Sequence, residues 1–310
     1  MLNIDFLNND YSVVACSVEA CLQLTIPPED LKNRTVKIDL SSEISSERLV
    51  EILTCAGFKR SQTVEGPGQF AHRGGIIDFF PPDSLQPVRI ELWGDSVDTI
   101  SFFDTLTQRR TDTVEACEIS PATEIIFDSD EVLKEKIENF LSQVSGKGSR
   151  KAKEVLNKDI EYLNSGIKLS SVDKYLSLAY DGTASIFDYC GEDLLFVCES
   201  GSVKDKAESA VKLLNNEIKA QFENGVLAKG LDRFALTFPE LLNIYEKQKA
   251  FYLDTFPRGT FDTAVKTLTS FNVQQTAIWN GSLEVLTDDI RPALKRGERC
   301  IVTAGTEKAA

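Results

Sequence analysis

The chain has 310 residues, which is long enough for two or three domains of ordinary size. Hydrophobic residues make up 42% of it and charged residues 26%, and no run approaches the ~18 apolar residues of a membrane helix, so we expect a globular protein without a membrane partner. The net charge of −14 argues against a general affinity for nucleic acid, because non-specific binding needs clustered Lys and Arg.

Residues 1–34 are predicted to be one piece of an α/β domain. The run Tyr11–Cys16 indicates a buried strand, and Val18–Leu24 indicates a short helix that ends before Pro27. One strand and one helix cannot bury a core by themselves. This piece must therefore pack against a later part of the chain.

Residues 35–121 have the pattern of a compact α+β unit. Thr35–Leu40 alternates like a strand, and Ser45 offers an N-cap to the amphipathic helix that follows. In Gly66–Arg110, turn signals separate short runs that are rich in Ile, Val, Phe and Trp, as in an antiparallel meander. A last strand is expected near Val114–Ile119.

The strand Val88–Trp93 is the most informative part of this meander. Its alternation predicts a core face of Val88, Ile90 and Leu92, and an opposite face of Arg89, Glu91 and Trp93. The next two residues, Gly94-Asp95, suit a tight hairpin. Burial does not explain a tryptophan on the charged side of a strand.

A second strand adds an arginine to this charged side. Alternation in Gln69–Arg73 places Gln69, Ala71 and Arg73 on one face. If that face coincides with the charged face of Val88–Trp93, two arginines flank an exposed Trp93. Arg and Trp are enriched at interface hot spots, so the arrangement favours a docking surface. The alternative is a solvated sheet face on which a neighbouring loop covers Trp93.

Residues 122–257 are predicted to form mixed α/β structure. Asp128, with Glu131 three residues later, resembles a capping box at the start of a helix. Leu194–Cys198 has the apolar run of a central strand. The other predicted elements are a helix through Ala152–Leu163, a charged helix at Lys204–Lys219 and a strand at Lys249–Leu253.

Residues 258–310 begin with a linker and continue into the start of another domain. Thr276–Trp279, a helix containing Leu283–Leu294, and Cys300–Thr303 suggest a β-α-β unit. The chain ends at Ala310, shortly after this unit. We therefore expect a segment of a longer protein, with this domain truncated.

The sequence shows no catalytic centre, cofactor site or metal site. The only histidine, His72, is better explained as a core residue, and Asp288-Asp289 as an acidic pair on a helix face. Gly146-Lys147-Gly148-Ser149 lacks the spacing of a phosphate loop. Seven scattered cysteines without a CxxC spacing, and an N-terminus that does not have the pattern of a signal peptide, favour reduced thiols in a cytoplasmic protein.

The stretch Gly68–Arg110 resembles the UvrB-like N-terminal module of the bacterial transcription-repair coupling factors. The likeness rests on Arg73-Gly74, on Arg89-Ile-Glu-Leu-Trp-Gly-Asp95 and on Thr107-Gln108-Arg109. A motif of this length is specific, and a weaker likeness extends over nearly the whole chain.

The resemblance implies a multidomain chain of mixed α/β and α+β class, in which a split α/β domain carries an inserted small antiparallel-sheet α+β domain. Residues 1–34 would end the first half of UvrB-like domain 1, and residues 35–121 would be the inserted domain 2. Residues 122–257 would be the second half of domain 1. Residues 258–310 would be a linker and the truncated start of a third, α/β domain.

In this family the inserted domain recruits UvrA, a protein of nucleotide-excision repair. The resemblance therefore implies a non-catalytic, cofactor-free adaptor that brings UvrA to stalled RNA polymerase. Carried onto the matching positions, the UvrA-binding residues are Arg73, Arg89 and Trp93, although the family usually has Phe where Trp93 stands. The full-length relatives are ATP-dependent DNA translocases, so RNA polymerase and double-stranded DNA are partners expected of a longer parent protein. We expect this chain to be monomeric.

Two other functions stay open at this point. A nucleic-acid-binding module would use Arg73, Arg89, Arg109 and Arg110 as a phosphate patch and stack a base on Trp93. A UvrB-type ATPase or helicase domain would need a phosphate loop, which the sequence does not show. A gel shift at low salt and a nucleotide-binding measurement distinguish these functions from that of a protein adaptor.

Overall fold

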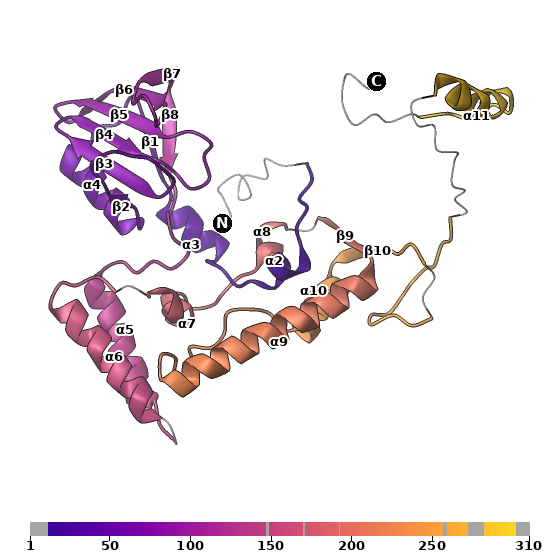
Figure 1. Cartoon of the computed structure of the whole chain (residues 1–310). Coiled ribbons are helices and arrows are strands. Elements are labelled where there is room, and N and C mark those ends of the chain that lie inside the picture. Colours follow the sequence, from indigo (N-terminus) through magenta and orange to yellow (C-terminus); the bar gives the residue numbers. More distant parts are fainter. Residues whose placement is uncertain are drawn as a thin grey trace. The chain divides into compact units, whose positions relative to one another are not determined.

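The computed structural model describes residues 12–146, 149–169, 171–191, 193–256, 259–271 and 282–301 (Figure 1). The chain divides into two compact units, residues 1–263 and residues 264–310. The described residues contain helices and both parallel and antiparallel strand pairs, which confirms the mixed α/β class. Among the described residues, no helix is long and apolar enough to span a membrane.

The first described segment contains two short helices. Helix α2 spans Val18–Leu22, as predicted, and α3 spans Pro28–Arg34. The strand predicted at Tyr11–Cys16 is wrong for residues 12–16, which are irregular, with Val13 84% exposed. An apolar run becomes a strand only where another strand supplies hydrogen-bond partners, and none of the described strands pairs with it. Tyr11 lies outside the described residues.

The segment that follows opens and closes with paired strands. Strand β1 (Val36–Asp39) runs antiparallel to β8 (Ala116–Ile119), so the chain enters and leaves this region at neighbouring positions. Helix α4 spans Ser46–Cys55, and the Ser45 side chain caps it by accepting a hydrogen bond from the Arg48 N–H. These elements confirm the predicted strands and helix start.

The largest sheet has six strands in the order β2-β3-β4-β5-β6-β7. Their bounds are Lys59–Arg60, Gln69–Arg73, Ile76–Phe79, Val88–Trp93, Ser96–Phe103 and Arg110–Val114. Strands β3 to β7 form the predicted antiparallel meander. The two-residue strand β2 joins parallel to β3, and the sequence does not signal it because two residues show no alternation.

One face of this sheet packs against α4 and forms the main core of the segment (Figure 1). Ile77, Ile90 and Ile100 are cross-strand neighbours on β4, β5 and β6, and each is fully buried. Leu49 and Leu53 of α4 are also fully buried in this core. The described members of this core all lie between Val36 and Ala122, which fits the predicted inserted domain, although its exact boundaries stay a prediction.

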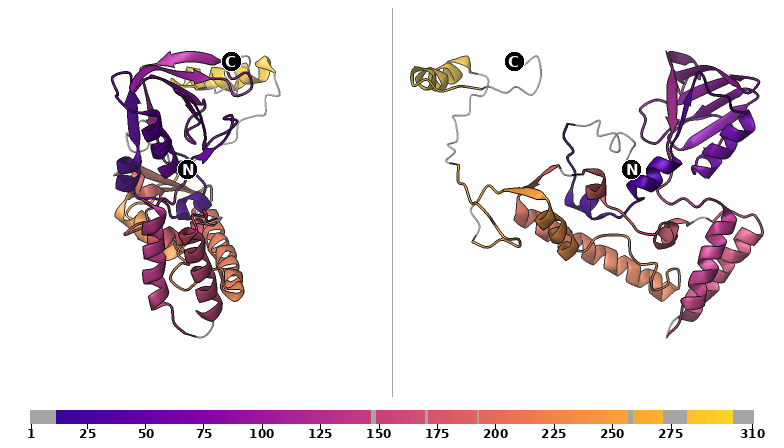
Figure 2. Two further views of the ribbon diagram at one scale, coloured as in Figure 1. Left: turned by 90° about the vertical axis from the view of Figure 1, so that its left-hand side faces the viewer. Right: turned by 180° about the vertical axis from the view of Figure 1, so that it is seen from behind.

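After the sheet, the chain forms a helical hairpin. Helices α5 (Asp130–Gln143) and α6 (Ser149–Asn164) lie side by side (Figures 1 and 2). The cap of α5 is Ser129, whose hydroxyl accepts a hydrogen bond from the Val132 N–H, and not the predicted Asp128. Asp128 lies one residue too early for this role, and its carboxylate pairs with Arg34 Nη1 at 2.9 Å.

The rest of the first unit contains short helices, a long helix and a second sheet. In chain order these elements are η1 (Asp173–Tyr175), α7 (Leu176–Ala179), α8 (Ile186–Tyr189), β9 (Leu194–Cys198), α9 (Ser200–Asn224), α10 (Phe238–Lys247) and β10 (Lys249–Leu253). The predicted charged helix and both predicted strands are present.

Strand β9 is not the central strand that its apolar run predicts. It pairs only with β10, in a parallel two-stranded sheet of described residues. Phe196 and Phe251 stack at a centroid distance of 5.4 Å and are 55% and 51% exposed. An apolar run predicts burial, but the fold sets how many strands lie beside it. Here only one face of the β9–β10 pair packs against the core.

The N-terminal helices pack against this later part of the chain, as predicted. The Leu24 N–H donates to the Phe234 carbonyl at 3.0 Å, and the Leu236 N–H donates to the Leu22 carbonyl at 2.7 Å. The buried Tyr189 hydroxyl donates to the Ile26 carbonyl at 2.7 Å. A shared apolar cluster of residues from both parts of the chain completes this packing.

Two cysteines meet at the start of α2. The sulfur atoms of Cys16 and Cys21 lie 3.2 Å apart, with Cys16 exposed and Cys21 buried. The hydrogen bond between them lowers the pKa of the Cys16 thiol to about 7. The same hydrogen bond, together with burial, raises the pKa of Cys21.

In the second unit the predicted helix is present as α11, which spans Leu283–Lys295 and is capped by Ser282. The predicted strand Thr276–Trp279 lies outside the described residues. Of the predicted strand Cys300–Thr303, residues 300 and 301 are irregular and the other two lie outside the described residues.

Candidate protein-interaction surface

The pairing register brings the predicted surface residues to one face of the six-stranded sheet. Ala71 lies opposite Asp78, and Asp78 lies opposite Arg89, so that three adjacent strands form a row. The next row contains Arg73 and Glu91, with Ile76 between them. This is the face opposite the isoleucine core. The register confirms that the faces of β3 and β5 coincide.

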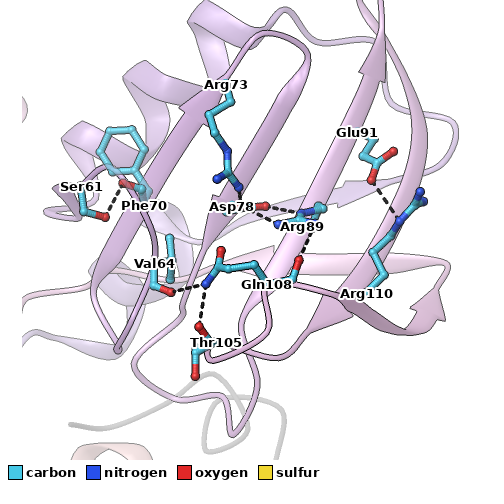
Figure 3. A network of polar contacts seen from close by, with 10 residues as sticks. All are labelled: Ser61, Val64, Phe70, Arg73, Asp78, Arg89, Glu91, Thr105, Gln108 and Arg110. Carbon is cyan, nitrogen blue, oxygen red and sulfur yellow. Dashed lines mark hydrogen bonds and ion pairs between the residues drawn. The ribbon is translucent and has the colours of Figure 1, made fainter.

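The aspartate in the first row binds both arginines (Figure 3). Arg89 Nε donates to Asp78 Oδ1 at 2.6 Å, and Arg89 Nη2 donates to Asp78 Oδ2 at 2.9 Å. Arg73 Nη2 also donates to Asp78 Oδ2. The Asp78 carboxylate therefore accepts two hydrogen bonds from the Arg89 guanidinium and one from the Arg73 guanidinium. Bidentate pairing of this kind makes charge-assisted hydrogen bonds strong.

The two arginines differ in their access to solvent. The side chain of Arg89 is 11% exposed, that of Arg73 is 45% exposed, and Asp78 is fully buried. The Arg89 guanidinium also lies 4.8 Å from the centre of the Phe103 ring and donates to the Gln108 carbonyl at 3.2 Å. The hydrogen bonds to Asp78 raise the pKa of Arg89 above its ordinary value. Arg89 is thus mainly an internal cation, whereas Arg73 reaches the surface.

Trp93 projects from the end of β5 and is 85% exposed. A register shift between Glu91 and Leu92 precedes it, and Trp93 then pairs with Ser96 across the predicted two-residue turn. Gly94 in that turn has φ +63°, a left-handed conformation that glycine adopts without a steric penalty. The turn is fixed from outside, because the Ile44 N–H donates to the Asp95 carbonyl at 2.6 Å. None of the loops that the structure describes covers Trp93, which contradicts the alternative of a covered tryptophan.

Asp78 is the member of this site that the sequence interpretation missed. A signal for it exists, because Asp78 interrupts the apolar run from Ile76 to Phe80. A carboxylate in a buried strand position needs a cationic partner. That requirement could have predicted an ion pair between Asp78 and one of the arginines on the neighbouring strands.

Two further residues have ordinary structural roles, and His72 is half-buried rather than the core residue that the sequence predicts. His72 Nε2 lies 2.7 Å from the Gly74 carbonyl oxygen, within its own hairpin. Arg110 Nε lies 3.3 Å from Glu91 Oε1. Within the part of the chain that the structure describes, no group of three or more His, Cys, Asp or Glu side chains could hold a metal ion. Lys147 and Gly148 of the glycine-rich stretch lie outside the described residues.

A family model for the UvrB interaction domain matches residues 36–125, which include β1, the sheet face described above and β8. The chain is also similar, over most of its length, to proteins of DNA repair. The transcription-repair-coupling factor of Bacillus subtilis is 29% identical over 97% of this chain, which corresponds to 26% of that protein. UvrABC system protein B of Thermotoga neapolitana is 25% identical over 96% of this chain and 48% of its own length.

The transcription-repair-coupling factor of Staphylococcus aureus is 22% identical over 91% of this chain. The chain spans about a quarter of the length of the coupling factors and about half that of the UvrABC system protein B that it matches. The matched segment coincides with the sheet, helix α4 and the closing strand pair. The chain is therefore similar to the transcription-repair coupling factors and to UvrABC system protein B, and its residues 36–125 match the UvrB interaction domain.

Proposed function

We propose that this chain is a non-catalytic adaptor whose interaction domain docks the nucleotide-excision-repair protein UvrA. The observation that carries the proposal is Trp93, a large aromatic side chain that is 85% exposed on the ordered sheet of a UvrB interaction domain. An exposed tryptophan on a rigid hairpin supplies a large apolar contact area at little entropic cost. The half-exposed Arg73 lies on the same face and adds a cation to the surface.

The proposal gives the three predicted binding residues different roles. Trp93 and Arg73 contact the partner, because both side chains reach solvent. Arg89 acts through Asp78, because its guanidinium is largely buried and makes hydrogen bonds on both sides. It holds the carboxylate that orients Arg73.

The test is the affinity of purified UvrA for the Trp93→Ala variant, measured by isothermal titration calorimetry. Loss of a central aromatic contact costs roughly 2 kcal/mol or more, so we expect affinity to fall by about 30-fold or beyond detection. The matched control is Phe256→Ala, which removes an aromatic side chain that is 77% exposed outside the interaction domain. Unchanged affinity of Trp93→Ala, or an equal loss in both variants, contradicts the assignment.

In a longer parent protein, the same docking would bring UvrA to RNA polymerase stalled on double-stranded DNA. Support for this step comes from the similarity to the transcription-repair coupling factors, of which the chain matches about a quarter. The step is tested by adding the parent protein to a stalled transcription complex and measuring recruitment of UvrA with and without the Trp93→Ala substitution.

Direct nucleic-acid binding is less well supported by the surface. Arg73 and Arg89 both bind Asp78, and Arg110 pairs with Glu91, so three of the four arginines of the predicted phosphate patch face carboxylates. Arg73 and Arg89 share the single negative charge of Asp78, so this group keeps one positive charge, which is less than the clustered cations that binding to a phosphate backbone needs. A gel shift at low salt that shows a complex would favour this alternative.

A further inference from the structure

We propose that Leu106, at the tip of the loop between β6 and β7, is a second apolar contact for the partner that docks on Trp93. This inference rests on the proposed function. The starting observation is that Leu106 is 92% exposed although its loop is tightly hydrogen-bonded. An apolar side chain held out in water by an ordered loop is a typical feature of a binding surface.

The loop of residues 104–109 is fixed by its own polar groups. Asp104 Oδ1 accepts hydrogen bonds from the Thr107 N–H at 2.7 Å and from the Thr107 hydroxyl at 2.8 Å. The Asp104 N–H donates to the Arg109 carbonyl at 3.0 Å, and the Gln108 N–H donates to the Asp104 carbonyl at 2.8 Å. Leu106 stands within this closed ring of bonds, so little conformational entropy remains to be lost when a partner covers it.

Gln108 connects the loop to the rest of the domain. Its side-chain Nε2 donates to the Thr105 carbonyl at 2.7 Å and to the Val64 carbonyl at 3.3 Å (Figure 3). Its backbone has φ +58°, a left-handed conformation that is uncommon for residues other than glycine. Such a conformation persists where the surrounding contacts hold it, and it occurs most often at functional sites.

The loop lies on the sheet face that carries the arginines. The Gln108 carbonyl accepts a hydrogen bond from Arg89, and Phe103, at the start of the loop, packs with Val64 and Ala71. Ala71 belongs to the same cross-strand row as Asp78 and Arg89. Leu106 therefore extends from the side of the sheet on which Trp93 is exposed.

Trp93 and Leu106 mark opposite ends of this face. Arg89 contacts the loop at one end of β5, and Trp93 lies four residues further along the strand, a rise of ~13 Å. Two exposed apolar side chains are thus separated by the polar group of Arg73, Asp78 and Arg89, which spans two adjacent rows. This separation suits an interface of standard size, which covers about 800 Å² on each partner.

The partner for this surface is UvrA, and its complementary region needs two apolar depressions with carboxylates between them. The cation that faces those carboxylates is the half-exposed Arg73, with Arg109 exposed beside Leu106. A single tryptophan could dock in several orientations. A second apolar contact at the far end of the face fixes one of them.

The experiment compares the affinities of four proteins for purified UvrA by isothermal titration calorimetry: the unmodified chain, Leu106→Ser, Leu106→Met and Leu213→Ser. We expect Leu106→Ser to weaken binding by at least about fivefold, the loss of one moderate contact, and Leu106→Met to bind nearly as well as the unmodified chain. Leu213 on α9 is 62% exposed and serves as the matched control. Thermal melts should show equal stability for all four, because neither leucine is buried.

The outcomes separate the two proposals. If the unmodified chain binds UvrA, Trp93→Ala loses binding and Leu106→Ser binds normally, then the role of Leu106 is overturned and the docking function stands. If Leu213→Ser weakens binding as much as Leu106→Ser, the effect is not specific to this face and the inference is also overturned. If the unmodified chain does not bind UvrA, both proposals fail.

Discussion

The side chains of Arg73 and Arg89 both bind Asp78, but they differ in their other contacts and in their exposure. Arg89 satisfies a buried carboxylate with two hydrogen bonds, contacts the Phe103 ring and reaches the β6–β7 loop. Arg73 contributes one hydrogen bond and is half-exposed. Removing one partner of a buried ion pair leaves an uncompensated charge, which is far more costly than losing a surface pair. Arg89 is therefore expected to matter first for stability.

We predict that the single substitution Arg89→Ala lowers the free energy of unfolding by about 3 kcal/mol. Arg73→Ala is the control and should cost less than about 1 kcal/mol, because Arg89 still satisfies Asp78. Urea denaturation followed by circular dichroism measures both values. Equal stability of the two variants would contradict the role given to Arg89. A loss of UvrA binding in Arg89→Ala is therefore compared with the free energy of unfolding of the same variant.

At the scale of single elements, helix α4 fixes the core face of the sheet. It packs the fully buried Leu49 and Leu53 against that face, and its two ends are defined by Ser45 and Gly57. Gly57 has φ +86°, and a Cβ there would lie 2.7 Å from Thr123 Oγ1. The helix therefore ends where glycine allows the chain to turn into β2 of the six-stranded sheet.

We predict that Ser45→Ala lowers the free energy of unfolding of the domain by about 1 kcal/mol, because the Arg48 N–H loses its acceptor. Ser46→Ala is the matched control. Ser46 is the first residue of the helix, where alanine is well tolerated, so its stability should change little. Chemical denaturation gives the comparison, and an equal loss in both variants would argue against the cap.

Two of the apolar cores in the first unit draw on the chain in different ways. The interaction domain draws its core from one continuous segment, closed by the β1–β8 pair. The core around α2 combines residues on both sides of that segment, since Leu22 and Leu24 pack with Leu236 and Leu241. This is the arrangement expected when one domain is inserted into another.

We therefore predict that residues 35–125 fold by themselves with a cooperative thermal transition and keep the UvrA affinity of the whole chain. Residues 122–263 alone should not fold cooperatively, because they lack the buried side chains of α2 and α3. Calorimetric melts of the two segments test this difference. A cooperative transition in the second segment, or its absence in the first, would refute the inserted arrangement.

Much of the local structure could be predicted from the sequence. Alternation identified the core face of β5, the Gly94-Asp95 pair identified its hairpin, and Ser45 identified the start of α4. These signals act within a few residues, so they can be recognised without knowing the fold. The wrongly placed strand at residues 12–16 and the assignment of β9 as a central strand failed because strand pairing depends on distant segments.

In the candidate site, strand alternation was enough to predict that Arg73, Arg89 and Trp93 lie together on the face opposite the core. The contacts and the exposure of these three side chains depend on the folded chain. Register placed Asp78 between the two arginines, and the Phe103 ring and the Gln108 carbonyl contact Arg89, while Trp93 and Leu106 remain in water. Alternation fixes the direction of a side chain, whereas its exposure and its partners depend on strands and loops that are far away in the sequence.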